Sequence, residues 1–168
     1  MTQIDEIDRE DDLALLLFHH ANEVDGITKL QKLIFLIQEE TEFTEVHEKI
    51  EFEFESYKYG PFSEEIYDRI RFLIAIGAIE AVDTDSDTDH VRTQDDQNDL
   101  SGKKFVLTEK GKKISYEFNE ILDDNIEEEI EAISNEYNDL TLNELLEYVY
   151  TQYPNYTDES EILEEVLE

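Results

Sequence analysis

Five of the thirteen basic residues of this 168-residue chain fall within eleven consecutive positions: Lys103, Lys104, Lys110, Lys112 and Lys113. Ammonium groups gathered in this way can neutralise the phosphates of double-stranded DNA, and such contacts give affinity without reading the base sequence. A second interpretation needs no ligand, because lysines also relieve the repulsion among neighbouring carboxylates. This lysine cluster is therefore a candidate nucleic-acid-binding site, with both interpretations open.

A second set of candidate residues lies on an expected helix that follows the YGPF motif. One stripe of this helix is apolar and consists of Ile66, Ile70, Leu73 and Ile74. Tyr67 and Phe72 flank the stripe, so they either belong to the core or offer the aromatic surface that protein partners bind. The opposite side carries acids, Asp68 among them, and an acid-rich helix face repels a DNA duplex. Arg71 is expected to pair with Asp68 three residues earlier, and with Tyr67 and Phe72 it forms the candidate protein-binding set.

No pattern in the chain points to catalysis or to a bound cofactor. The four histidines are His19, His20, His47 and His90. His19 and His20 project about 100° apart on a helix, whereas a metal site needs ligands that converge. The chain has no cysteine, which excludes disulfides, thiolate catalysis and cysteine-based metal sites. It also lacks the GxGxxG, GxxxxGK[ST], HExxH and GxSxG motifs, so we expect no catalytic residue, cofactor or metal.

A run of alternating aspartates resembles the start of a calcium-binding loop. The aspartates are Asp83, Asp85, Asp87 and Asp89. Counted from Asp83, the sixth position is Thr88, where the loop requires glycine, and the twelfth is Gln94, where it requires glutamate. We therefore interpret this stretch as a solvated loop.

Hydrophobic periodicity predicts the elements that position these residues. Helices are expected from Asp11 to Gly26, from Thr28 to Gln38, from Ser63 to about Gly77, from Thr108 to Ile133, from Thr141 to Gln152, and briefly at 162–167. Strands are expected at 50–57, 79–82 and 103–108. The last two strands would form a hairpin with a long polar tip.

This order of elements is typical of a winged helix-turn-helix. The expected fold class is mainly α with a small β wing (α+β), extended by C-terminal helices. Residues 10–113 would form the winged-helix core, with a flexible acidic wing tip at 83–102. Residues 114–168 would either pack on this core or form a homodimer, in which the long helix pairs with its copy. The lysine cluster would then lie at the base of the wing, where winged helices often contact phosphates.

The chain is strongly acidic, with 46 acidic residues against 13 basic ones and a formal net charge of -33. Self-repulsion of this size destabilises a compact protein at ordinary ionic strength. At about 1 M salt the Debye length is only about 3 Å, so the composition indicates adaptation to very high salt, of haloarchaeal type. An acidic mimic or tail is the alternative, but such segments usually concentrate their charges in blocks.

The hydrophobic content of 39% is enough for one domain, or for one domain plus an appendage, with a real core. No stretch approaches the roughly 18 apolar residues that a membrane span requires. The N-terminal sequence MTQIDEIDREDD has none of the regions of a signal peptide. We therefore expect a cytoplasmic protein that makes no contact with a membrane.

Four stretches of the sequence resemble known families. ITKLQKLIFLIQ at 27–38 and YKYGPFSEEIYDRI at 57–70 resemble the KLQKL-type helix and the YGPxS-type turn of Panacea antitoxin-like domains and their YwgA-like relatives. FVLTEKGKKISYEF is similar to the wing strand and following helix of winged-helix proteins, and YPNYTDESEI extends the resemblance to most of the chain. The resemblance implies a small helical domain with a wing and no cofactor, which acts in regulation or neutralises a toxin or phage protein.

The sequence leaves two functions open. The first is a non-enzymatic winged-helix regulatory protein that binds a protein partner, such as a toxin, in the manner of an antitoxin. The alternative is a DNA-binding transcriptional regulator whose lysine cluster contacts the phosphates.

Overall fold

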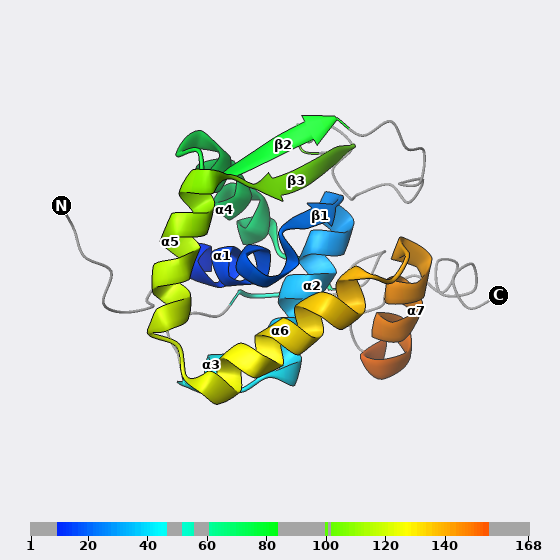
Figure 1. Cartoon of the computed structure of the whole chain (residues 1–168). Coiled ribbons are helices and arrows are strands. Elements are labelled where there is room, and N and C mark those ends of the chain that lie inside the picture. The colour runs from blue at the N-terminus through cyan, green and yellow to red at the C-terminus, as the bar shows by residue number, and fades with distance from the viewer. Residues whose placement is uncertain (1–9, 47–51, 56–60, 84–99, 101, 155–168) are drawn as a thin grey trace.

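The computed structural model describes residues 10–46, 52–55, 61–83, 100 and 102–154, and it is mainly helical with one small sheet (Figure 1). Its elements are α1 (Glu10–Ala21), β1 (Glu23–Asp25), α2 (Ile27–Glu40), α3 (Phe43–Val46), α4 (Glu64–Ala75), β2 (Ile79–Asp83), β3 (Lys103–Leu107), α5 (Glu109–Glu120), α6 (Asp124–Asn138) and α7 (Leu142–Gln152). The α+β class expected from the sequence is confirmed. In the part of the chain described, no helix is long and apolar enough to cross a membrane.

The helix α2 lies at the centre of the hydrophobic core, as the sequence predicts. Its apolar side chains are buried all around the helix, including Phe35 and Leu36, which lie outside the expected apolar stripe. α1, α6 and α7 pack against it (Figure 1). The helix begins at Ile27 with Gly26 as its N-cap, whereas Thr28, the expected cap, is buried within the helix. Glycine suits the cap because the φ there is 112°, a conformation that other residues rarely adopt.

The sheet contains three antiparallel strands in the order β1-β3-β2, whereas the sequence predicts only the hairpin of β2 and β3. The prediction that the first helix continues to Gly26 is wrong, because α1 ends at Ala21. Asn22 follows with a φ of 69°, which asparagine tolerates, and its carbonyl accepts a hydrogen bond from the amide of Leu107. Val24 then pairs with β3 and is buried. Periodicity missed this strand because a helix would bury Val24 as well.

The single helix expected from Thr108 to Ile133 is also wrong, because the chain turns between α5 and α6. In the connection, Leu122 is buried while Ile121 is 40% exposed. The turn lets both helices pack against α1, in different directions (Figure 1). A straight helix would carry its second half away from that core, so the burial of Ile126 and Ile130 favours the break.

The strand expected at 50–57 is not found in its described part, residues 52–55. The predicted alternation is present, since Phe52 is buried and Glu53 is exposed. The backbone, however, forms an isolated bridge between Glu55 and Phe62 and no longer ladder within these residues. The amide of Phe52 donates to Gln38 Oε1 at 2.6 Å, and its carbonyl accepts from Gln38 Nε2 at 3.1 Å. The side-chain amide of Gln38 on α2 thus makes the two main-chain hydrogen bonds that a neighbouring strand would otherwise make with Phe52.

Two predicted helix starts are confirmed by their capping hydrogen bonds. Thr108 caps α5 by accepting from the amide of Gly111 at 3.0 Å. Thr141 and Glu144 form the predicted capping box of α7, with bonds of 3.1 and 2.9 Å. Ser63 is the N-cap of α4, but its buried hydroxyl has no hydrogen-bond partner among the described residues. Most of the expected wing tip and the stretch 162–167 lie outside the described residues.

Candidate interaction surfaces

The exposed side of α4 is the first candidate surface, and it combines charge with apolar area. Glu64, Glu65 and Asp68 are exposed in the first half of the helix. Phe72, in the second half, is 38% exposed and is one of three large apolar side chains left in water among the described residues. An exposed aromatic ring beside charged groups can anchor a protein partner.

The other two candidate residues of α4 are placed differently. Tyr67 is buried, and its ring meets Phe62 nearly edge to face, with 5.6 Å between the centroids. The guanidinium carbon of Arg71 lies 5.8 Å from the centroid of the Tyr67 ring. Arg71 Nη1 is 3.5 Å from Asp68 Oδ1, so the predicted ion pair is confirmed. The buried Tyr67 ring therefore packs under the Arg71 guanidinium and exposes little surface that a partner could contact.

The expectation that the lysine cluster lies together at the base of the wing is wrong for two of its members. Lys103 and Lys104 begin β3 opposite the end of β2, at the tip side of the hairpin, whereas the other three lysines lie on α5 beyond its base. Most of the ammonium groups have partners within the chain. Three ion pairs are Lys103 with Asp83, Lys104 with Glu23 at 3.5 Å, and Lys112 with Glu109 at 3.1 Å. These pairs are open to solvent, so each contributes little to stability. Lys113 is exposed. The paired carboxylates reduce the positive potential that a phosphate backbone would meet.

Lys110 has a structural role that the sequence does not reveal. Its Nζ donates to the carbonyl of Ile76, the C-cap of α4, at 2.6 Å. The last turn of α4 contains no basic residue, so a lysine from α5 supplies the positive charge that a helix C-terminus favours. Lys29 of α2 does the same for α6, where its Nζ donates to the carbonyl of Asn138 at 2.6 Å.

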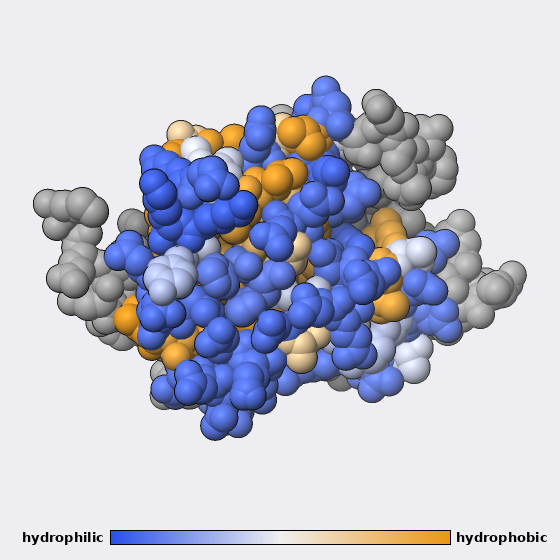
Figure 2. Space-filling model, in the orientation of Figure 1, coloured by the Kyte–Doolittle hydropathy of each residue, from blue (hydrophilic) through white to orange (hydrophobic). Residues whose placement is uncertain are grey.

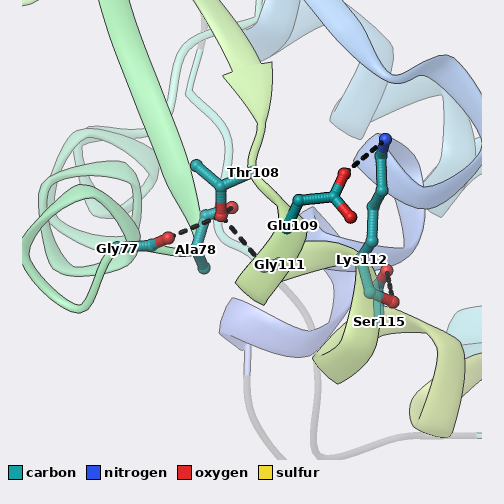
Figure 3. Close-up of polar contacts among 7 residues, drawn as sticks. All are labelled: Gly77, Ala78, Thr108, Glu109, Gly111, Lys112 and Ser115. Carbon is teal, nitrogen blue, oxygen red and sulfur yellow. Dashed lines mark hydrogen bonds and ion pairs between the residues drawn. The ribbon is translucent and has the colours of Figure 1, made fainter.

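Thr108 connects the start of α5 to the turn between α4 and β2 (Figure 3). Its hydroxyl oxygen lies 2.6 Å from the carbonyl of Gly77 and 2.9 Å from the carbonyl of Ala78. The same oxygen accepts the capping bond from Gly111, so this hydroxyl acts both as a donor and as an acceptor. The base of the hairpin is thereby fixed to the C-terminal end of α4.

Gly111 is required because α5 approaches this turn very closely. A Cβ atom at position 111 would lie 2.0 Å from the carbonyl oxygen of Ala78 and 2.6 Å from Cδ1 of Leu107. The first of these atoms belongs to the backbone and cannot rotate away. The TEKGK stretch therefore encodes a junction between α5 and β2 in addition to a group of positive charges.

Three polar side chains of α2 bind the segment that leads into α4, and sequence reasoning missed them. We call Gln31, Lys32 and Gln38 the polar clamp; each is at most 7% exposed. Gln31 makes two hydrogen bonds of 2.9 Å with the main chain of Ser63, just as Gln38 binds Phe52. The available signal was the presence of polar residues in an otherwise apolar helix, because buried amides must find partners.

Lys32 is the charged member of the polar clamp and is 2% exposed. Its Nζ donates to the carbonyl of Pro61 at 3.0 Å. Burial lowers the pKa of Lys32 to about 7, because the charged form loses its hydration. The KLQKL-type helix and the YGPxS-type turn thus meet in space, where Gln31 and Lys32 of the first bind Ser63 and Pro61 of the second.

Glu40, at the end of α2, collects three tyrosine hydroxyls. Tyr137 of α6 donates to Oε1 at 3.3 Å, while Tyr148 and Tyr153 donate to Oε2 at 2.6 and 2.7 Å. Burial and the bond to Glu40 raise the pKa of Tyr148 and of Tyr153. This cluster ties α6, α7 and the residue after α7 to the central helix.

The two adjacent histidines lie in the contact between α1 and α5. His19 Nδ1 is 3.0 Å from Ser115 Oγ, and His20 Nε2 is 3.2 Å from Asn119 Oδ1. Burial, and then the neighbouring His20, lower the pKa of His19. His47 and His90 lie outside the described residues. Among the residues that are described, no group of three or more His, Cys, Asp or Glu side chains could hold a metal ion.

These features define a class of protein, namely a small mainly helical domain whose buried polar side chains hold charged surface helices in place. A comparison with family models identifies the family. The model of the antitoxin SocA-like, Panacea domain matches residues 30–154, or 125 of the 168 residues. The chain therefore belongs to this family, and the matched region contains the polar clamp, α4 and the lysine cluster. No curated protein and no solved structure matches the chain significantly.

Proposed function

We propose that this chain is a non-enzymatic regulator of antitoxin type, which binds a protein partner such as a toxin through the exposed side of α4. Membership of the antitoxin-like family supports a protein partner. The exposure of Phe72 carries the choice of surface, because this ring is 38% exposed, follows Arg71 in the sequence and lies downstream of an acidic helix start. Aromatic and arginine side chains are the residues that most often dominate binding energy at protein interfaces.

A winged-helix architecture for residues 10–113 is part of this proposal. The element order α1, β1, α2, α4, β2, β3 and the sheet order β1-β3-β2 support it. In this architecture α4 takes the position of the recognition helix, and β2 with β3 forms the wing. The acids spread over the chain support a further part of the proposal, namely that the protein works in a cytoplasm of very high salt.

DNA binding by the lysine cluster is the second candidate function. Two observations disfavour it. Three of the five lysines form ion pairs with carboxylates, and a fourth, Lys110, binds the end of α4. In addition, Glu64 and Glu65 occupy the first turn of α4, where a recognition helix would meet the DNA groove and its phosphates.

Photo-crosslinking at position 72 tests the protein-partner proposal in the cell. Phe72 is replaced by photoreactive p-benzoylphenylalanine, and the same residue is placed at Ile121, which is 40% exposed, as a matched control. We expect position 72 to give one major protein adduct and position 121 to lack it. With the purified partner, Phe72→Ala should weaken binding by on the order of 2 kcal/mol, while Ile121→Ala should bind like the unmodified chain.

The DNA alternative predicts a different pattern in the same proteins. Lys103→Glu combined with Lys112→Glu would weaken binding to every duplex and reduce the slope of log affinity against log salt by about 0.9 per lost phosphate contact. These positions are preferable to Lys110, whose reversal would also disturb the end of α4. Tight binding to the promoter DNA of its own gene, abolished by this double reversal and unchanged in Phe72→Ala, would refute the protein-partner proposal.

A further inference from the structure

The helix α5 differs from the other surface helices in its charge. It contains three lysines and three glutamates, so its formal net charge is zero in a chain of -33. The next helix, α6, contains six acidic residues and no basic one. α2 is neutral as well, but Lys32 is buried there and Lys29 binds the end of α6. Figure 2 shows that the face formed by α5 and α6 is hydrophilic over most of its area.

The charges of α5 are separated along the helix. The three lysines occupy its first half, where Glu109 is paired with Lys112, and the exposed glutamates Glu117 and Glu120 occupy its second half. Tyr116 lies between the two halves and is 56% exposed, more than any other large apolar side chain described. Since Lys113, Tyr116 and Glu120 follow one another at intervals of three and four residues, they share the outward face of the helix.

We propose that this face of α5 is a self-association surface, on which a second copy of the chain docks with its own α5 antiparallel. A two-fold axis beside Tyr116 would place Lys113 of each copy opposite Glu120 of the other. The Tyr116 rings would meet at the axis, where they are shielded from water. A two-fold interface requires a surface that is complementary to itself, and the separation of charge along α5 provides that complementarity.

The net charge of the chain makes α5 the favoured contact among the described helices. Two copies that each carry a charge of -33 repel one another. Contact through α6 would bring carboxylates against carboxylates, whereas antiparallel contact through α5 brings opposite charges together around an aromatic centre. A parallel contact of two α5 helices would lose this advantage, because lysines would then face lysines.

Sedimentation velocity of the full chain over a concentration series tests the proposal. We expect a reversible equilibrium between monomer and dimer. Lys113→Glu leaves a carboxylate on each side of Tyr116 on the outward face, and Glu120→Lys leaves an ammonium group on each side. Like charges would then meet across the two-fold axis, so each single reversal should weaken dimerisation at least about tenfold. The double variant, Lys113→Glu with Glu120→Lys, should recover dimerisation, because both pairs form again in the opposite sense. For the same reason, a mixture of the two single variants should form heterodimers.

Thermal unfolding of each variant checks that these exposed substitutions leave the fold intact, and Phe72→Ala, on α4, is the control that should dimerise normally. If a reversal unfolds the chain, Tyr116→Lys tests the same axis, since two ammonium groups would then meet there. A chain that stays monomeric at every concentration overturns the proposal. A dimer that the single reversals do not weaken, or that the double variant does not recover, overturns it as well.

Discussion

The polar clamp and the lysine cluster both consist of polar side chains held mainly on helices, but they differ in their access to water. Members of the clamp are at most 7% exposed and bind main-chain groups of Phe52, Pro61 and Ser63. The paired lysines of the cluster face carboxylates in solvent. When one side chain of a buried hydrogen bond is removed, the remaining donor or acceptor has no water to bind. When one side chain of an exposed ion pair is removed, water hydrates the remaining charge. Even in so highly charged a chain, the polar contacts that contribute most to stability are therefore the hydrogen bonds buried away from water.

The largest effect is expected at Gln31, whose amide serves two main-chain groups of Ser63. Gln31→Leu keeps a similar volume but leaves a buried N–H and a buried C=O unpaired, at about 1 to 3 kcal/mol each. The free energy of unfolding, measured by denaturant titration, should therefore fall by about 2 to 6 kcal/mol. Gln152→Leu, at an exposed position of α7, is the control and should change it little. Equal effects from the two variants would contradict the comparison.

An intermediate effect, dependent on pH, is expected at Lys32. Its pKa is about 7 in the folded chain, against about 10.4 for a lysine in water. Between these values the unfolded chain binds a proton that the folded chain does not. The free energy of unfolding therefore rises with pH in this window, by up to about 1.4 kcal/mol per pH unit. The contribution of Lys32 to this free energy is least favourable below pH 7, where the buried amine is charged.

Lys32→Met removes this titration and gives a direct measurement of it. The difference in unfolding free energy between the unmodified chain and Lys32→Met should grow in favour of the unmodified chain as the pH rises from about 7 to about 9. The same difference for Lys103→Met, at a partly exposed lysine, is the control. If both differences follow the same course, Lys32 does not titrate as a buried group.

The smallest effect is expected from the ion pairs of the lysine cluster. Lys103→Gln and Lys112→Gln each remove one exposed pair, which is worth about 0 to 1 kcal/mol. Denaturant titration of the double variant should therefore give nearly the unfolding free energy of the unmodified chain. A loss as large as that of Gln31→Leu would mean that the cluster is an essential structural element, and the contrast with the polar clamp would fail.

Local patterns in the sequence predicted most helices, the β2–β3 hairpin and two of the caps. The Asp68–Arg71 pair was also predictable, because both partners lie on one helix at fixed spacing. The ends of elements were harder to predict. Strand β1 forms because Val24 pairs with β3, which is distant in the sequence. The chain turns between α5 and α6 because both helices pack against α1.

The candidate sites divide in the same way. The sequence identified Phe72 and the lysine cluster as chemically distinctive, but it could not determine which of these groups are exposed and which have partners. Tyr67 and Phe72 are similar in sequence context, yet one is buried against Phe62 and the other lies in water. Likewise, the contact of Lys110 with Ile76 joins residues that are 34 positions apart, which no local pattern encodes.

By itself the sequence determined the secondary structure that depends on residues close together in the chain. It also determined the acidic character of the surface and the resemblance to antitoxin-like domains. The tertiary structure alone decided that Gln31, Lys32 and Gln38 serve the backbone of another segment and that position 111 must be glycine. The reason is physical. Propensity, periodicity and capping act over a few residues, whereas burial and hydrogen-bond partnership depend on which distant segments the folded chain brings together.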